Sequence, residues 1–405
     1  MSKRITFAFI GCGAFAKNFV NLFKNHPYVE KVYVCDLDRA KARDFSQRFG
    51  VETVDSFEEV LKRPDIDCVG NFTRRHTHGD ITIRALQGGK HVFSAVPMAS
   101  SVEECRKIVE LVKTTGLTYV IGETCYYYPC AMFCREANRA GKFGDFAYGE
   151  AQYYHHINEI SYGAVAQERG MPPLFYPTHS TAMILSAADS YVKKVACFGC
   201  GDKSGDPAFT PQGNPWGNTF LNQYVFMELA NGGTARVTEA RGFGWGKPSS
   251  YISGFYGTKG GYEFSNAQHL LVETNFYKGE KPFEIKLTDV SDYVNPEEMV
   301  ANKALPDFKQ QVARGKWQWS SFSAVQAKEA ARLPESFRGL ENGHMGSHQF
   351  LVDDFCRAAL SGEIPALNAW FAARCNIPGL VAVESAKTGG TVMEVPDCGD
   401  APGGN

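Results

Sequence analysis

Two tyrosines and one histidine stand at positions suited to exchanging protons with a bound molecule. The segment Tyr176-Pro-Thr-His179 places a phenol three residues before an imidazole, and both would share one face if a helix begins there. Histidine titrates near ~6.5, whereas a phenol titrates near ~10 and needs a neighbouring positive charge to act as a base. Tyr127 is the third candidate, because it follows the strand-like segment 117–121. A histidine bonded to backbone and tyrosines that only pack are the alternatives.

A glycine-rich turn follows the first apolar segment, residues 5–10. It reads Gly-Cys-Gly-Ala-Phe-Ala over residues 11–16, the GxGxxA form of the dinucleotide-binding turn. The first glycine permits the tight turn, the second lets the backbone approach a pyrophosphate, and the following helix offers N–H groups to the phosphates. We expect the cofactor to contact Gly11, Cys12, Gly13, Ala14 and Phe15.

An acidic residue at the end of the second strand-like segment indicates which dinucleotide is bound. Asp36 can accept hydrogen bonds from the adenosine ribose, and its charge repels a 2′-phosphate. The sequence therefore favours NAD(H) over NADP(H). Arg39 either lies over the adenine or pairs with Asp36, and a solvated position on the helix surface is the alternative.

Strand-like and helix-like segments alternate through the first part of the chain. Short apolar segments, from 5–10 to 117–121, are separated by helical stretches such as 101–114, which begins with a Ser-x-x-Glu capping box. Strands separated by helices of this length indicate a parallel sheet covered on both faces. The predicted fold class is α/β, with a Rossmann doubly wound parallel sheet in residues 1–125.

The second part of the chain has a different pattern. Residues 143–162 and 220–264 alternate apolar and polar side chains, and Asn231-Gly-Gly233 is a hairpin turn signal. We expect residues 126–405 to form a C-terminal α/β domain with an open-faced, mainly antiparallel sheet.

The composition is that of an ordinary globular protein and excludes several classes. At 405 residues two domains are expected, and the formal net charge of −2 gives no general attraction to nucleic acid or to an anionic membrane. No apolar run approaches the ~20 residues that span a bilayer, and the basic-then-apolar N-terminus resembles a strand more than a signal peptide. The 12 cysteines lack a pattern of four metal ligands and fit a reducing, cytoplasmic location.

The segment 68–93 carries a resemblance to a known family. It combines an apolar strand, a turn with Thr73, then His78 and the run Ala-Leu-x-x-Gly-Lys-His-Val over residues 85–92. In these features the chain resembles the Gfo/Idh/MocA oxidoreductases. The resemblance implies that Thr73, His78 and Pro97 lie at the cofactor, and that the open sheet joins subunits into a homodimer or homotetramer.

One departure from the family bears directly on the chemistry. The family usually continues with Glu-Lys-Pro, and its lysine helps to move the proton of the substrate hydroxyl during hydride transfer. This chain has Ala95-Val-Pro97 at that place, so Val96 replaces the lysine. The dehydrogenase activity of the family therefore cannot be transferred to this chain on the resemblance alone.

Three short segments resemble a narrower group, the NAD-dependent retaining glycosidases of the superfamily, which include α-N-acetylgalactosaminidases. These segments are Tyr176–His179, Glu123–Tyr128 and Glu150–His155. Similar segments also occur in relatives that cleave sulfoquinovosides or oxidise carbon 3 of glycosides. The resemblance implies that Tyr127 is the carbon-2 base or the acid for the leaving group.

Four further residues are candidates for contacts with a sugar or glycoside substrate. Arg75 follows the third strand, where its planar guanidinium could clamp an anionic group. Either His155 or His156 faces the site, because neighbours on a strand point to opposite sides. Arg241 and His344 complete the set, with ion pairing as the alternative for both arginines. No metal is expected, because His344 and His348 lack a third ligand.

Three functions remain open on the sequence. The leading one is an NAD-dependent glycoside hydrolase that works by transient oxidation at carbon 3, elimination, water addition and re-reduction. An NAD-dependent sugar 3-dehydrogenase is the main alternative, since His179 and Tyr176 could replace the lysine. A non-catalytic NAD(H)-sensing regulator is the third, and it leaves these two residues unexplained.

Overall fold

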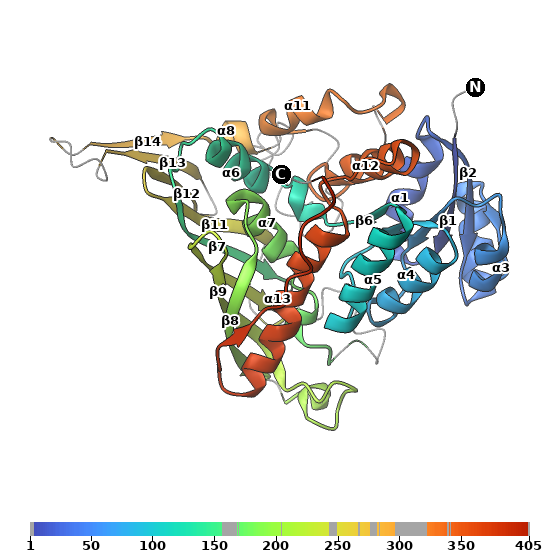
Figure 1. The fold of residues 1–405 in the computed structure, drawn as a ribbon, viewed down its shortest axis with the longest axis horizontal. Coiled ribbons are helices and arrows are strands. Elements are labelled where there is room, and N and C mark those ends of the chain that lie inside the picture. Colours follow the sequence, from blue (N-terminus) through green and yellow to red (C-terminus); the bar gives the residue numbers. More distant parts are fainter. Residues whose placement is uncertain are drawn as a thin grey trace, which may run out of the picture.

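The structure is a computed structural model, and it contains two sheets. It describes residues 4–155, 168, 170–203, 205–242, 249–265, 268–275, 282, 284–295, 322–337, 340 and 342–403. Within these residues, one sheet has six strands and the other nine (Figure 1).

The first sheet has the strand order β3-β2-β1-β4-β5-β6, and every pairing in it is parallel. The order reverses between β1 and β4, where open α/β sheets bind their ligands. This confirms the predicted doubly wound parallel sheet. Its strands are β1 Ile5–Ile10, β2 Val29–Cys35, β3 Glu52–Thr53, β4 Cys68–Asn71, β5 His91–Ser94 and β6 Tyr119–Ile121. Its helices are α1 Ala14–Asn25, α2 Arg39–Phe49, α3 Phe57–Lys62, α4 His78–Gln87 and α5 Val102–Thr115.

Helix α12, Ser347–Ser361, returns from the C-terminal part of the chain to this first sheet and lies near α1 (Figure 1). The ring of Phe355 meets Phe7, Phe23 and Phe93 with centroids 5.7, 6.0 and 5.8 Å away. Edge-to-face contacts of this kind add to the stabilisation gained by burying the rings. The C-terminal residues are therefore not confined to the second sheet, and the predicted boundary at residue 125 falls inside the short helix η2, Thr124–Tyr127.

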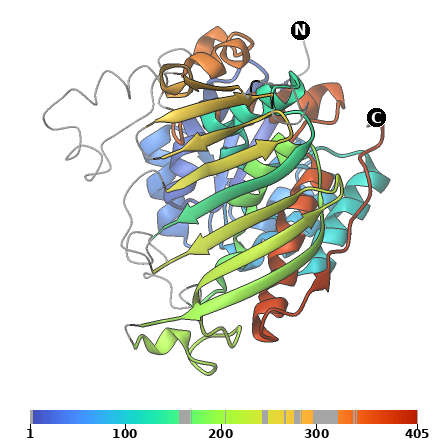
Figure 2. The ribbon, with the colours of Figure 1, turned by 90° about the vertical axis from the view of Figure 1, so that its left-hand side faces the viewer.

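The second sheet has the order β14-β13-β12-β11-β7-β10-β9-β8-β15 and is mainly antiparallel, as predicted. Its one parallel pairing joins β7 and β10. Helices cover one of its faces, and none of the described helices covers the other (Figure 2). The strands are β7 Phe146–Tyr154, β8 Val192–Gly201, β9 Phe220–Leu229, β10 Thr234–Ala240, β11 Ser250–Gly257, β12 Gly260–Phe264, β13 His269–Thr274, β14 Ile285–Asp289 and β15 Met393–Glu394.

Ten further helices belong to the described part of the chain. Helix α7 is buried along its whole length, and its buried side chains include the polar His179 and Ser180 as well as apolar ones. In addition to α12 and η2, these helices are η1 Arg75–Thr77, α6 Pro129–Arg139, η4 Pro173–Phe175, α7 Thr178–Ala188, η5 Pro207–Phe209, α8 Ser291–Val294, η7 Ala324–Gln326, α11 Ala327–Ala330, η8 Glu335–Phe337 and α13 Ala369–Lys387.

The structure describes all 12 cysteines, and none of them forms a disulfide bond. Among the described residues, no helix combines the length and the apolar composition that crossing a membrane requires. The cytoplasmic location stays a prediction.

Candidate active site

The turn after β1 is shaped for a dinucleotide. Gly11 has φ +97°, and a Cβ atom there would lie 2.5 Å from the carbonyl oxygen of Phe72, so only glycine fits. A Cβ on Gly13 would meet nothing within 4 Å, so the backbone is open on that side. Helix α1 begins at Ala14, and no side chain caps its first N–H groups. These groups therefore remain available to phosphate oxygens, which fits NAD at this turn.

Asp36 is held in position for the ribose by the backbone. Its Oδ2 accepts a hydrogen bond from the N–H of Cys12, and its Oδ1 accepts one from Asp38, both at 2.8 Å. A carboxylate has about four lone-pair positions, so two remain for ribose hydroxyls. Arg39 is exposed at the start of α2, and its contact with adenine stays a prediction.

His78 joins the loops that follow β4 and β5. Its Nδ1 lies 2.7 Å from the carbonyl oxygen of Pro97, and its Nε2 lies 3.3 Å from that of Thr73. Burial lowers the pKa of His78, and only 1% of the residue is exposed. The imidazole bonds to backbone and holds together the two loops that carry Thr73 and Pro97. The contact of these three residues with the cofactor stays a prediction.

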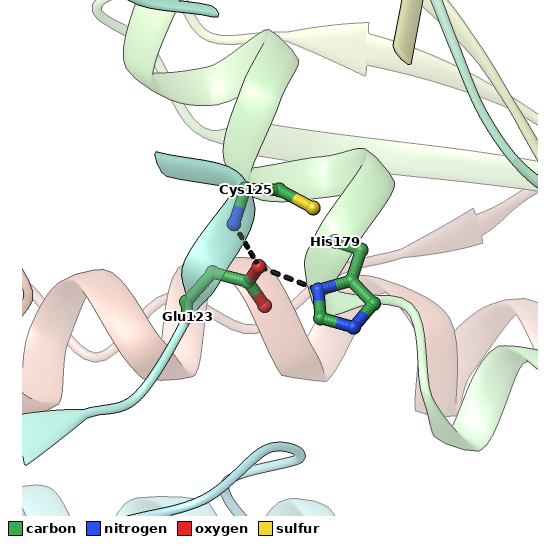
Figure 3. A group of neighbouring side chains, drawn as sticks. All are labelled: Glu123, Cys125 and His179. Carbon is green, nitrogen blue, oxygen red and sulfur yellow. Dashed lines mark hydrogen bonds and ion pairs between the residues drawn. The ribbon is translucent and has the colours of Figure 1, made fainter. Parts of the chain in front are cut away.

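His179 lies between an acid and a phenol. Its Nδ1 is 2.6 Å from Oε1 of Glu123, and its Nε2 is 3.1 Å from the hydroxyl of Tyr176. Oε1 of Glu123 also accepts the N–H of Cys125 at 2.9 Å, and Figure 3 shows the carboxylate between that N–H and the imidazole. The structure thus brings together two of the three predicted catalytic residues and adds Glu123.

The charge on Glu123 determines how the imidazole is used. Burial raises the pKa of the carboxyl, but the charge and hydrogen bond of His179, together with the N–H of Cys125, more than offset it and leave the pKa lowered. An ionised Glu123 accepts a hydrogen bond from Nδ1 of His179. Nε2 is then the nitrogen that faces Tyr176, and it can take up or release a proton there.

Tyr153, at the end of β7, completes this group. Its ring lies 4.9 Å from the imidazole of His179, edge to face. The guanidinium of Arg241 lies over the same ring at 4.8 Å and pairs with Glu239 at 3.0 Å. The ring of His155 is 5.6 Å from Tyr153, so both predicted substrate residues lie beside it. His156 lies outside the described residues.

A buried acid balances Arg241. Ser180 donates a hydrogen bond to Oε1 of Glu239 at 2.6 Å, while Oε2 faces the guanidinium. Burial raises the pKa of Glu239 to about 7, and Arg241 opposes that rise. The charge of this pair therefore changes near neutral pH.

Tyr127 is not part of the His179 group. Its hydroxyl donates to Asp354, which Arg332 pairs with at 2.8 Å, and its ring packs on Phe350 with centroids 4.9 Å apart. Tyr127 thus lies apart from the other two catalytic candidates, and its catalytic role stays a prediction. Helix η2 turns Tyr127 toward α12, while the next residue, Tyr128, interacts electrostatically with Glu123 and Tyr153.

His344 also lies elsewhere than expected. Its Nδ1 is 2.8 Å from Nε2 of His348, and its ring meets Phe15 at 5.8 Å, edge to face. Phe15 belongs to the dinucleotide turn, so His344 contacts the cofactor half of the site. Its predicted contact with the sugar stays untested.

Arg75 lies beside Tyr176, and its predicted contact with the substrate stays a prediction. Its guanidinium is 4.4 Å from the centre of the Tyr176 ring. Its backbone N–H donates to Oε1 of Glu168 at 3.0 Å.

Three possible metal ligands meet at His179. Ligand atoms of Glu123, Cys125 and His179 lie within 4.8 Å of one another. Burial, followed by the charge of Glu123, raises the pKa of the Cys125 thiol well above its usual value, which favours the thiol over the metal-binding thiolate. The absence of a metal stays a prediction.

Sequence reasoning missed three members of this group. Glu123 and Tyr153 lay inside segments that carried the resemblance, which is the signal that could have found them. For Glu239, the sequence offered no sign of a role other than its position two residues before Arg241.

Comparison with known proteins finds a family match for the cofactor half. Residues 5–123 match the Gfo/Idh/MocA family, described as an oxidoreductase family with an NAD-binding Rossmann fold. These residues are therefore similar to the NAD-binding domain of that family, which supports NAD as the cofactor.

Two similar proteins are named after glycosidases. A glycosyl hydrolase family 109 protein from Shewanella putrefaciens is 33% identical over 159 residues, and an alpha-N-acetylgalactosaminidase from Shewanella oneidensis is 31% identical over 159 residues. Each match covers 37% of this chain and 35% of the relative. The chain thus matches about a third of these relatives' length.

Solved structures with the same fold cover almost the whole chain. A levoglucosan dehydrogenase in complex with NADH and levoglucosan has a TM-score of 0.69 at 15% identity, covering 98% of this chain and 100% of that one. An oxidoreductase domain protein from Kribbella flavida has a TM-score of 0.70 at 16% identity, with the same coverage. At these low sequence identities, the similarity shows a common fold and nothing further.

Proposed function

We propose that the protein is an NAD-dependent glycoside hydrolase that oxidises carbon 3 of its sugar transiently and restores it at the end of each turnover. The observation that carries this proposal is the Glu123–His179–Tyr176 chain of hydrogen bonds, which provides a proton acceptor where Val96 cannot. Relatives named as family 109 glycosyl hydrolases support it.

The proton of the carbon-3 hydroxyl has a route through this chain. Tyr176 accepts it as its own phenol proton passes to Nε2 of His179, and Glu123 balances the charge of the imidazolium. NAD+, when bound, accepts the hydride from carbon 3 and later returns it. The route runs in reverse when the ketone is reduced.

The ketone makes the proton on carbon 2 acidic, so a second base is needed. Tyr153 is the candidate, because its phenol is next to His179 and beneath the guanidinium of Arg241. Removing this proton breaks the bond between carbon 1 and the leaving group, which departs with a proton. Water then adds across the double bond that has formed between carbon 1 and carbon 2. Because the hydride is returned to carbon 3, no net oxidation results.

A paired assay on purified protein tests the proposal. Aryl glycosides of both anomers, including N-acetylated and sulfonated sugars, are screened for released phenol while NADH absorbance is followed. Phenol released over many turnovers without stoichiometric NADH is expected. NADH formed in proportion to an oxidised sugar, with the glycosidic bond intact, would overturn the hydrolase.

The second candidate is an NAD-dependent sugar 3-dehydrogenase. The observation that favours it is the fold, which matches a levoglucosan dehydrogenase along 98% of the chain. It would use the same Tyr176–His179 route but exchange NAD(H) in every turnover. A non-catalytic NAD(H)-sensing regulator would show neither product in the paired assay.

The open sheet face is the proposed contact between subunits of a homodimer or homotetramer. Phe198 on β8 and Phe226 on β9 are 59% and 53% exposed, and large aromatic side chains of this kind are enriched in interfaces. Light scattering after size exclusion should show an oligomer that Phe226→Glu weakens, with the exposed Lys286→Glu on β14 as a control. A wild-type monomer would exclude this interface.

A further inference from the structure

Tyr176 has a charged neighbour that the family resemblance does not account for. Val96 is buried and neutral at the place where a lysine would have supplied a positive charge. The guanidinium of Arg75 lies 4.4 Å from the centre of the Tyr176 ring. We propose that Arg75 is a positioning residue that supplies this charge and stabilises the Tyr176 phenolate as the proton moves. The inference rests on the proposed function, because it assigns a role within the same proton route.

The backbone holds Arg75 at this place. Arg75 is the first residue of η1, and its N–H donates to Oε1 of Glu168 at 3.0 Å. The side chain of Glu168 is only 4% exposed, so the contact is fixed inside the protein. Burial lowers the pKa of Arg75, but a guanidinium titrates so high that it remains charged at any working pH.

The charges around Tyr176 come from several elements. Burial raises the pKa of its phenol, and the positive charge of Arg75 is the largest effect that opposes this rise. Glu123 on the η2 side raises the pKa, Arg241 at the end of β10 lowers it, and Cys125 raises it. Arg241 is already paired with Glu239, and the Tyr153 ring lies 5.8 Å away. Arg75 is therefore the cation with the strongest hold on this phenol.

The role follows from the proton balance. When the phenol proton of Tyr176 passes to Nε2 of His179, the phenolic oxygen gains negative charge before it takes the proton of the substrate hydroxyl. A cation over the ring is attracted to that charge. Arg75 thus favours the state in which Tyr176 can accept a proton, without touching the reacting atoms.

The pH dependence of kcat/KM tests this role on the holoenzyme. Without the charge, the pKa of the Tyr176–His179 pair rises, so the ascending limb of the profile moves to higher pH. For Arg75→Gln we expect a shift of about one pH unit, which is roughly a tenfold loss at neutral pH that higher pH restores. Arg75→Lys should keep part of the charge and move the limb less.

The neighbouring Arg74→Gln is the matched control, because this arginine is 53% exposed and its guanidinium lies 4.0 Å from Glu168, the acid that also binds the N–H of Arg75. It should leave the limb where it is. The proposal is overturned if Arg75→Gln leaves the limb unmoved, or if its loss appears only as a raised KM that pH does not restore.

A spectroscopic titration separates this inference from the proposed function. The tyrosinate absorbance of each protein is compared with that of its Tyr176→Phe counterpart, which isolates the Tyr176 signal without any sugar. Its midpoint should lie higher in the Arg75→Gln background than in the wild type, and equal midpoints would refute the role of Arg75. A wild type that releases no phenol would instead refute the hydrolase and leave this titration to decide on Arg75.

Discussion

Nδ1 of His179 lies 2.6 Å from Oε1 of Glu123, although 56 positions separate the two residues. Glu123 follows the last strand of the parallel sheet, and His179 is in the first turn of α7 beneath the second sheet. The contact therefore ties the NAD-binding half of the protein to the half that would hold the sugar.

Replacing Glu123 by Gln should keep the shape and remove the charge that orients and balances His179. We expect kcat/KM to fall by about 10²- to 10⁴-fold while bound NAD is retained, because an imidazolium is no longer stabilised. The measurement is phenol release together with cofactor content after gel filtration. His179→Ala should show the same pattern, and the double variant should lose little more, since the two act as a unit.

A general acid–base group typically contributes about 100-fold or more to the rate. Activity within about threefold of wild type for either variant would therefore exclude that residue from the proton route.

Replacing Asp36 by Ala should weaken NAD and reduce the preference for NAD over NADP. Two hydrogen bonds to ribose hydroxyls disappear, along with the charge that repels a 2′-phosphate. A loss of roughly 1.5–3 kcal/mol corresponds to about ten- to a hundredfold in Kd. Calorimetry on cofactor-free protein measures both dinucleotides. Unchanged affinities would mean that Asp36 only holds the Cys12 and Asp38 amides.

Tyr127→Phe should affect stability and leave catalysis intact. The variant loses the hydrogen bond to the partly buried Asp354, at an expected cost of about 1–3 kcal/mol in the free energy of unfolding. Denaturant unfolding and kcat/KM are measured on the same preparation, with Tyr176→Phe as the contrasting variant. A stable Tyr127→Phe protein without activity would restore the catalytic role that the sequence suggested for it.

Glu239 should make stability depend on pH in the neutral range. Its folded pKa of about 7 lies above the ordinary value of about 4.3, so the folded state holds the proton more tightly than the unfolded state. The stabilisation of the folded state by protonated Glu239 is therefore complete at low pH, and it is lost as the pH rises from about 4.3 to about 7. Glu239→Gln cannot titrate, so wild type should lose roughly 3–4 kcal/mol relative to it over that window.

Thermal melts across pH measure this difference, and Glu228→Gln on the exposed part of β9 is the control. Parallel curves for wild type and Glu239→Gln would show that Glu239 is charged throughout.

Local patterns in the sequence determined the NAD-binding half. The strand–turn–helix order, the glycines at 11 and 13 and the acid at 36 act within one supersecondary unit, and the structure places them as expected. Short-range steric and hydrogen-bonding rules decide such features, because Gly11 must adopt a positive φ beside Phe72 whatever the rest of the chain does. Alternating side chains also sufficed to predict the open antiparallel sheet.

Only the tertiary structure decided which side chains meet. In a 3₁₀ turn, successive side chains point about a third of a turn apart, so the direction of each tyrosine in 126–128 depends on how η2 packs. The turn directs Tyr127 to Asp354 and puts Tyr128 near Glu123. Glu123 reaches His179, and Arg75 reaches Tyr176, because separate elements pack together in the folded chain. Sequence spacing carries no information about such contacts, since they are made by side chains that the fold alone brings into range.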